Sequence, residues 1–320
     1  MRKARLIAPW HQSDLIAALE AEGLSVEELA ALKGKPAIYH CISRVVDRRF
    51  VLGDAEREQF VSYMRIYERF CGVRVLTFCV MSNHFHILLE VPATPAKRGA
   101  DWSDDRLLDH LAELYTPPQM GALRWELEHY RKQENTEGAE AFRERYFRRM
   151  WDLSQFMKPL KQRFTSWFNR KHGRKGTLWE ERFKSLLVED GHAARTMAAY
   201  IDLNPVRAGM VKDPADYRWS SYGEAIGGGS KGNGKTARGG LVRALRAHQG
   251  VGANADLWAS GVSQEYRKLL MAGAASKTSE SVSRDGKTVT KTLRKGVSKD
   301  EAERESKRDG EIPFGKMLRC

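Results

Sequence analysis

Two histidines stand close together in an apolar stretch of the chain, VMSNHFHILLEV, at residues 80–91. His84 and His86 are two positions apart, with Phe85 between them, and side chains at that spacing project from the same face of a β-strand. Two imidazoles on one face can bind a divalent cation and leave further positions to other residues, water or a substrate oxygen. A hydrogen-bonded pair of surface histidines fits the same spacing, so both interpretations stay open.

The cysteines do not complete a closed zinc site around these histidines. The sequence has no CxxC pair, and its four cysteines are Cys41, Cys71, Cys79 and Cys320. Cys79 is close in sequence, but strand alternation predicts that it lies on the opposite face. A structural zinc site needs four ligands, so an open site fits better. A zinc-dependent hydrolase is one possible function of such a site, and it predicts that zinc stays bound through purification.

A tyrosine more than a hundred residues later could supply a nucleophile. Residues 191–204, GHAARTMAAYIDLN, predict a helix that ends at Pro205. Tyr200 lies off the centre of the apolar face, where it either flanks the core or presents its phenol at the sheet edge. Asn204 shares that side if the helix reaches it, although the residue before a proline disfavours helical conformation. A phenolate beside a cation can attack a phosphodiester.

The segments around these residues predict an α+β fold. Strands are expected at 37–45, 73–80, 84–91 and 182–189, and helices at 55–70, 151–173 and 191–204. This is a βαββαβ order with one extra helix, the ferredoxin-like plan of an antiparallel sheet with helices on one face. The first and third strands are central in that plan, so the histidine pair would lie on a central strand.

The remaining segments are expected to be additions to this core. The predicted boundaries are 1–36 for an N-terminal helical extension, 37–222 for the core with a helical insertion at about 92–150, 223–240 for a flexible Gly-rich linker, 241–274 for a small helical segment and 275–320 for a disordered basic tail.

The charge balance favours a polyanionic partner. The 320 residues include 54 Lys and Arg against 41 Asp and Glu, a net charge of +13, which most often indicates nucleic acid but also fits a merely basic protein. The N-terminus is too polar for a signal peptide, and no apolar run reaches the roughly 18 residues of a membrane span. We therefore expect a cytoplasmic, nucleoid-associated protein that contacts no membrane.

Several basic side chains are candidate phosphate contacts. Arg44 and Lys184 are expected on strands near the proposed site, and the aromatic residues of the helix at 151–173 are assigned to the core. The DNA-binding candidates are Arg44, Lys158, Lys161, Arg182, Lys184 and Arg207.

Four blocks of this sequence together resemble the REP-associated tyrosine transposases, which are HUH single-tyrosine transposases. MSNHFHILLE resembles their histidine–hydrophobic–histidine motif. The other blocks are YHCISR at 39–44, GTLWEERFKSLLVE at 176–189, and YIDLNPVRAGMV at 200–211 followed by YRWSSY at 217–222. They occur in the family's order and span most of residues 37–222.

The resemblance implies a metal-dependent single-stranded DNA endonuclease and strand transferase. By position, His84 and His86 match the metal ligands, Tyr200 the nucleophile and Asn204 the residue that can complete the metal site. The implied cofactor is Mg²⁺ or Mn²⁺. The implied substrate is single-stranded DNA with imperfect, REP-like hairpins, cleaved to a 5′ phosphotyrosine and a free 3′ hydroxyl by a monomer or homodimer.

The sequence departs from the family pattern at the hairpin turn, where Ser82-Asn83 replaces the usual Pro-Asn. It also has the long insertion and larger terminal extensions, which leave the DNA specificity and oligomeric state open. The alternative function is a non-catalytic nucleic-acid-binding protein, because the βαββαβ sheet also serves RNA-binding modules. Histidines occupy the positions where such modules place aromatic residues.

Overall fold

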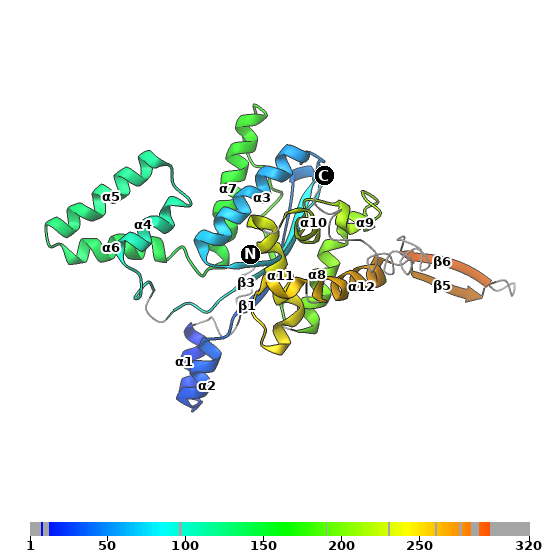
Figure 1. The fold of residues 1–320 in the computed structure, drawn as a ribbon, viewed down its shortest axis with the longest axis horizontal. Helices are drawn as coiled ribbons and strands as arrows, with labels where there is room; N and C mark the ends of the chain where they lie inside the picture. Colours follow the sequence, from blue (N-terminus) through cyan, green and yellow to red (C-terminus); the bar gives the residue numbers. More distant parts are fainter. Residues whose placement is uncertain are drawn as a thin grey trace. The chain divides into compact units, whose positions relative to one another are not determined.

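The protein is built around a four-stranded sheet with the strand order β2-β3-β1-β4. Figure 1 labels β1 and β3 of this sheet. The computed structural model describes residues 8, 13–95, 98–189, 191–229, 231–259, 261–274, 277–282 and 288–294. The strands are β1 (Ala37–Arg44), β2 (Arg74–Val80), β3 (His84–Val91) and β4 (Lys184–Val188). The α+β class, the antiparallel sheet and the central position of β1 and β3 are confirmed.

Contacts within the chain divide it into two units. One unit comprises Met1–Arg74 with Leu89–Leu187, and the other comprises Val75–Leu88 with Val188–Cys320. The histidine pair and Tyr200 belong to the second unit.

Two long helices form the core of the first unit, α3 (Asp54–Cys71) and α7 (Leu153–Lys171), which lie side by side in Figure 1. Apolar residues at helical spacing face each other across this contact. The ring of Phe60 meets Phe164 edge to face, with centroids 5.3 Å apart. Helix α3 stops where Gly72 takes a φ of 62°, a left-handed conformation that glycine adopts without steric cost.

Three helices lie between β3 and α7 in the described residues. They are α4 (Asp104–Ala112), α5 (Pro117–Lys132) and α6 (Thr136–Phe147). Asp104 joins the three helices, because its carboxylate accepts from Arg131 of α5 at 2.7 Å and from Arg143 of α6 at 2.5 Å. In the described part of residues 1–36, the helices are α1 (Ser13–Ala21) and α2 (Val26–Lys33).

The second unit adds five helices to β2 and the start of β3 among the residues described. They are α8 (His192–Asp202), α9 (Asn204–Arg207), α10 (Ser221–Gly227), α11 (Gly232–Arg246) and α12 (Val262–Ala274). Residues 223–240 therefore do not form the flexible linker predicted from their glycines. A Cβ at Gly240 would lie 2.4 Å from the Val75 carbonyl oxygen, so this glycine allows α11 to approach β2 closely.

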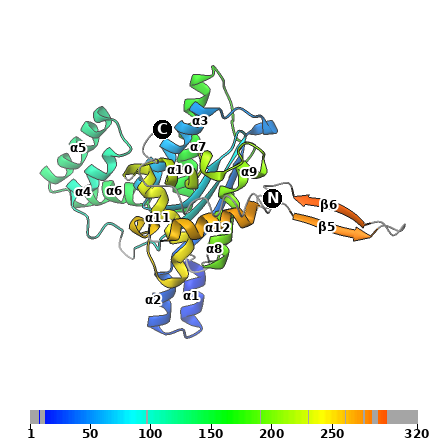
Figure 2. The ribbon, with the colours of Figure 1, turned by 45° about the vertical axis from the view of Figure 1, so that its right-hand side comes forward.

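The described part of the C-terminal tail also differs from the prediction. Strands β5 (Lys277–Val282) and β6 (Thr288–Arg294) pair antiparallel in a two-stranded sheet (Figure 2). The other residues of the predicted disordered tail lie outside the described residues. In the described ranges, no helix has the length and apolar character needed to cross a bilayer.

Candidate active site

The two histidines lie together at the start of β3. Their ring centroids are 5.0 Å apart, with the rings at 79° to each other. His86 is buried and His84 is partly exposed. The Met81 amide donates to the His84 carbonyl oxygen at 2.8 Å, which closes the turn between β2 and β3. Strand geometry thus places both imidazoles where one cation could contact them.

Asn83 orients the ring of His84. The Nδ1 atom of His84 is 2.6 Å from the Asn83 Oδ1 atom. An amide oxygen only accepts hydrogen bonds, so Nδ1 donates its proton and the lone pair is on Nε2. Metal-ligating histidines usually have such a partner on the second nitrogen. This arrangement fits a cation bound through Nε2.

Tyr200 lies beside the histidine pair. Its ring centroid is 6.1 Å from that of His86, with the planes at 84°, and the residue is 43% exposed. The sequence left open whether this tyrosine flanks the core or presents its phenol. The exposed side chain next to His86 shows that Tyr200 presents its ring at the surface and does not flank the core, although β3 is a central strand and not the sheet edge.

Asn204 continues the helical path of α8 despite the proline that follows. Leu203 between the helices has φ −86° and ψ −4°, and Pro205 occupies the first turn of α9, where a proline needs no amide proton. The side-chain nitrogen of Asn204, Nδ2, donates to the Tyr200 and Ile201 carbonyl oxygens, each at 3.1 Å. Its Oδ1 atom is therefore the end of the amide that could serve as a ligand.

The donor set suits an open cation site better than a closed one. Across the residues described, no group of three or more His, Cys, Asp and Glu side chains is placed to hold a metal. His84 and His86 with the amide oxygen of Asn204 would supply at most three protein ligands. Water or phosphate oxygens would complete the coordination of a cation such as Mg²⁺ or Mn²⁺.

A buried carboxylate that the sequence did not single out anchors α8, the helix that carries Tyr200. Asp202 accepts from Thr77 Oγ1 at 3.0 Å, the Tyr222 amide at 3.1 Å and the Tyr266 hydroxyl at 2.6 Å. Complete burial raises its pKa to about 6, although these hydrogen bonds favour the ionised form. The only signal in the sequence is an acidic residue at the end of an amphipathic helix.

The predicted DNA contacts fall into three groups. Arg44, Arg182 and Lys184 line a cavity in the first unit, and Arg207 lies in α9 beside Tyr200. Lys158 is exposed on α7, but Lys161 is buried and donates to the Glu181 carbonyl oxygen at 2.9 Å. The structure therefore assigns Lys161 a role in packing.

Residues 35–97 match the family described as IS200-like transposases. The match is to a transposase family and covers only this part of the chain. It contains β1, α3, β2 and β3 with both histidines, and it confirms the resemblance predicted from the sequence. The family description of the matched segment supports a general role in DNA processing. Tyr200 and Asn204 lie beyond the matched residues.

A solved structure of a REP-associated tyrosine transposase bound to a REP hairpin is similar to this chain at 15% identity and a TM-score of 0.37. The similarity covers 62% of this chain and 83% of that chain. No curated protein matches this chain.

Proposed function

We propose that the protein is a metal-dependent single-stranded DNA endonuclease and strand transferase with Tyr200 as its nucleophile. The observation that supports this most strongly is the position of the exposed Tyr200 ring, 6.1 Å from the ring of His86. A potential nucleophile and two potential metal ligands, distant in sequence, meet at one place. Such a constellation is typical of metal-assisted phosphoryl transfer.

The reaction is a transesterification at phosphorus. After losing its proton, the Tyr200 phenolate oxygen attacks a backbone phosphate, and the bond from phosphorus to the 3′ oxygen breaks. The departing oxygen takes up a proton to become a 3′ hydroxyl, while the 5′ phosphate remains on Tyr200. A divalent cation held by His84, His86 and Asn204 would offset the charge that develops on the phosphate.

The proposed substrate is single-stranded DNA with imperfect, REP-like hairpins, as the family resemblance implies. The net charge of +13 favours such a polyanion. Lys158, Lys184, Arg44 and Arg182 are exposed and remain proposed DNA contacts. A monomer and a homodimer are both compatible with this chemistry.

The test is to mix the protein with end-labelled, hairpin-bearing single-stranded DNA and Mn²⁺ and to look for a covalent adduct under denaturing conditions. The wild-type protein should form the adduct, and EDTA or Tyr200→Phe should abolish it. Tyr130→Phe, a partly exposed tyrosine in α5, is the matched control and should form it normally.

An adduct that survives Tyr200→Phe would overturn the nucleophile assignment. DNA binding that is indifferent to metal, without any strand cleavage, would instead support the non-catalytic nucleic-acid-binding alternative.

A further inference from the structure

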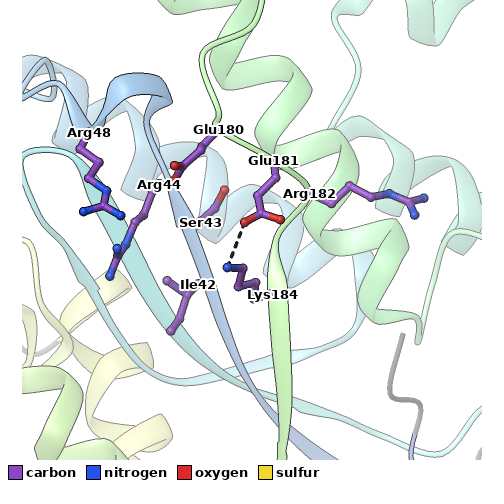
Figure 3. Close-up of a pocket in the computed structure, with 8 residues that line it drawn as sticks. All are labelled: Ile42, Ser43, Arg44, Arg48, Glu180, Glu181, Arg182 and Lys184. Atoms are coloured by element: carbon purple, nitrogen blue, oxygen red, sulfur yellow. Dashed lines mark ion pairs between the residues drawn. The ribbon is translucent and has the colours of Figure 1, made fainter. Parts of the chain in front are cut away.

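A cavity of about 220 Å³ lies in the first unit, where β1 ends and the segment before β4 passes it. Figure 3 shows its lining side chains. They are Ile42, Ser43, Arg44, Arg48, Glu180, Glu181, Arg182 and Lys184. None of these residues belongs to the unit that contains the histidines and Tyr200.

Backbone hydrogen bonds at the end of β1 build this cavity. The Glu180 amide donates to the Arg44 carbonyl oxygen at 2.9 Å, and the Val46 amide donates to the Leu178 carbonyl oxygen at 2.9 Å. The chain then turns through Asp47 and Arg48, whose φ angles are 57° and 54°. This left-handed conformation is uncommon for residues other than glycine, and it reverses the chain so that Arg44 and Arg48 line the same cavity.

The charges on the lining favour an anion. Four lining side chains are basic and two are acidic, and Glu181 is already paired with Lys184 at 2.9 Å. Arg44 and Arg48 extend to one side of the cavity in Figure 3, whereas Arg182 extends to the other. Guanidinium groups match phosphate oxygens in geometry and charge.

Ser43 lines this cavity with a buried side chain. The residue is only 5% exposed, and its hydroxyl has no hydrogen-bond partner in the part of the chain that the structure describes. Buried hydroxyl groups nearly always have a partner. The Ser43 hydroxyl oxygen is closed to solvent, so the case for an anion depends on the basic side chains of the lining.

An exposed aromatic side chain follows the cavity in sequence. Phe50 is two residues after Arg48 and is 81% exposed, the highest value among the large hydrophobic residues found exposed in the described segments. Arg49 between them is also exposed. Basic residues interleaved with an exposed aromatic ring are typical of surfaces that bind unpaired nucleic acid strands, because each base can stack on the ring.

We propose that this cavity binds a backbone phosphate of an unpaired DNA strand, with Phe50 stacking on a neighbouring base. The cavity thus anchors the strand and takes no part in the chemistry at Tyr200. The proposal rests on the proposed function, since the strand is taken to be that enzyme's DNA substrate.

The test measures binding of a fluorescent single-stranded oligonucleotide by anisotropy in EDTA, over a range of salt concentrations. Arg44→Gln with Arg48→Gln should raise Kd about tenfold and reduce the salt slope by roughly 0.7, the value for one phosphate contact on a single strand. Arg124→Gln with Lys132→Gln removes the same charge from exposed positions on α5 and should change Kd less than about twofold.

Phe50→Ala tests the stacking contact independently. Loss of one stacked base should raise Kd about fivefold or more for single-stranded DNA and leave binding of a blunt duplex unchanged. Trp125→Ala, which removes another exposed aromatic ring on α5, is its control. Circular dichroism would establish that each variant is folded.

Two results would overturn the proposal: equal losses of affinity in the two charge-matched double variants, or a Phe50→Ala protein that binds single strands as tightly as wild type. The proposed function fails separately. Wild-type protein that forms no covalent adduct would contradict that function, whatever the cavity variants do to binding.

Discussion

Arg207 lies over the aromatic ring of Tyr200, with its guanidinium carbon 4.7 Å from the ring centroid. The Nη1 atom of the same side chain donates to the Tyr200 carbonyl oxygen at 3.0 Å. The sequence predicted Arg207 as a DNA contact. This geometry favours a different role, in which Arg207 holds the tyrosine ring in place.

Arg207→Gln should therefore slow adduct formation without weakening DNA binding. Cation–π contacts contribute about 0.5–2 kcal/mol, so the single-turnover rate at saturating DNA should fall roughly 2- to 30-fold. Arg207→Lys should recover part of the rate. The control is Arg218→Gln, an exposed arginine 5.5 Å from the ring centroid of Trp219. A raised Kd with an unchanged rate would show that Arg207 is a DNA contact instead.

Asn83→Ala should weaken the response to metal. Without the Asn83 oxygen, the His84 ring loses the partner that holds Nδ1, and the loss of such partners typically lowers metal affinity about 10- to 100-fold. The Mn²⁺ concentration for half-maximal cleavage should rise by that factor. The neighbouring Ser82→Ala is the control. An unchanged Mn²⁺ requirement in Asn83→Ala would contradict the role of Asn83 in orienting His84 for a metal.

Tyr266→Phe should destabilise α8, the helix that carries Tyr200, although Tyr266 itself lies in α12. The change removes the hydroxyl that donates to buried Asp202 at 2.6 Å, and an under-satisfied buried acceptor costs about 1–3 kcal/mol. Urea denaturation should show this loss in the free energy of unfolding. Tyr200→Phe, at an exposed position, should be as stable as wild type. Equal stability of Tyr266→Phe and wild type would argue against Asp202 as an anchor.

The protein should lose stability in mild acid through His40. Burial lowers the pKa of His40 from 6.5 to about 4, so the unfolded chain binds a proton at a pH where the folded protein does not. The stabilisation that His40 gives the folded protein by staying neutral is complete above pH 6.5. It is lost as the pH falls through 4, and the free energy of unfolding then drops by about 3 kcal/mol. His40→Gln should flatten the curve of unfolding free energy against pH in this window. An unaltered curve would show that other groups dominate.

Lys158 and Lys161 on α7 should behave differently. Lys161→Met should lower the thermal midpoint, because the ammonium group donates to the Glu181 carbonyl oxygen and is buried. Lys158→Gln removes an exposed charge and should reduce the salt slope of DNA binding with little effect on the midpoint. The opposite pattern would restore Lys161 as a phosphate contact.

The pairing of the histidines could be predicted because a strand has a period of two residues. The apolar sequence from Phe85 onwards predicts the strand, and the strand places His84 and His86 on one face. The proximity of Tyr200 could not be derived from local pattern. It depends on how α8 packs in the unit that contains β3, and only the family resemblance indicated it.

Composition was misleading where small or charged residues serve packing. The glycines at 223–240 predicted flexibility, yet Gly240 is needed because α11 lies against the backbone of β2. Lys161 looked like a surface charge, yet its stem is buried and its ammonium group binds a carbonyl oxygen. Asp202 was missed because the groups that donate to it, among them Thr77 and Tyr266, come from other segments of the chain.

The central claim is that Tyr200 becomes covalently attached to DNA, and peptide mass spectrometry tests it most directly. Trypsin should release residues 196–207, TMAAYIDLNPVR, a peptide with a single tyrosine. After reaction with DNA and Mn²⁺ and digestion with nuclease, this peptide should carry a nucleotide joined through its 5′ phosphate to the Tyr200 oxygen. The same modification on any other peptide would contradict the claim.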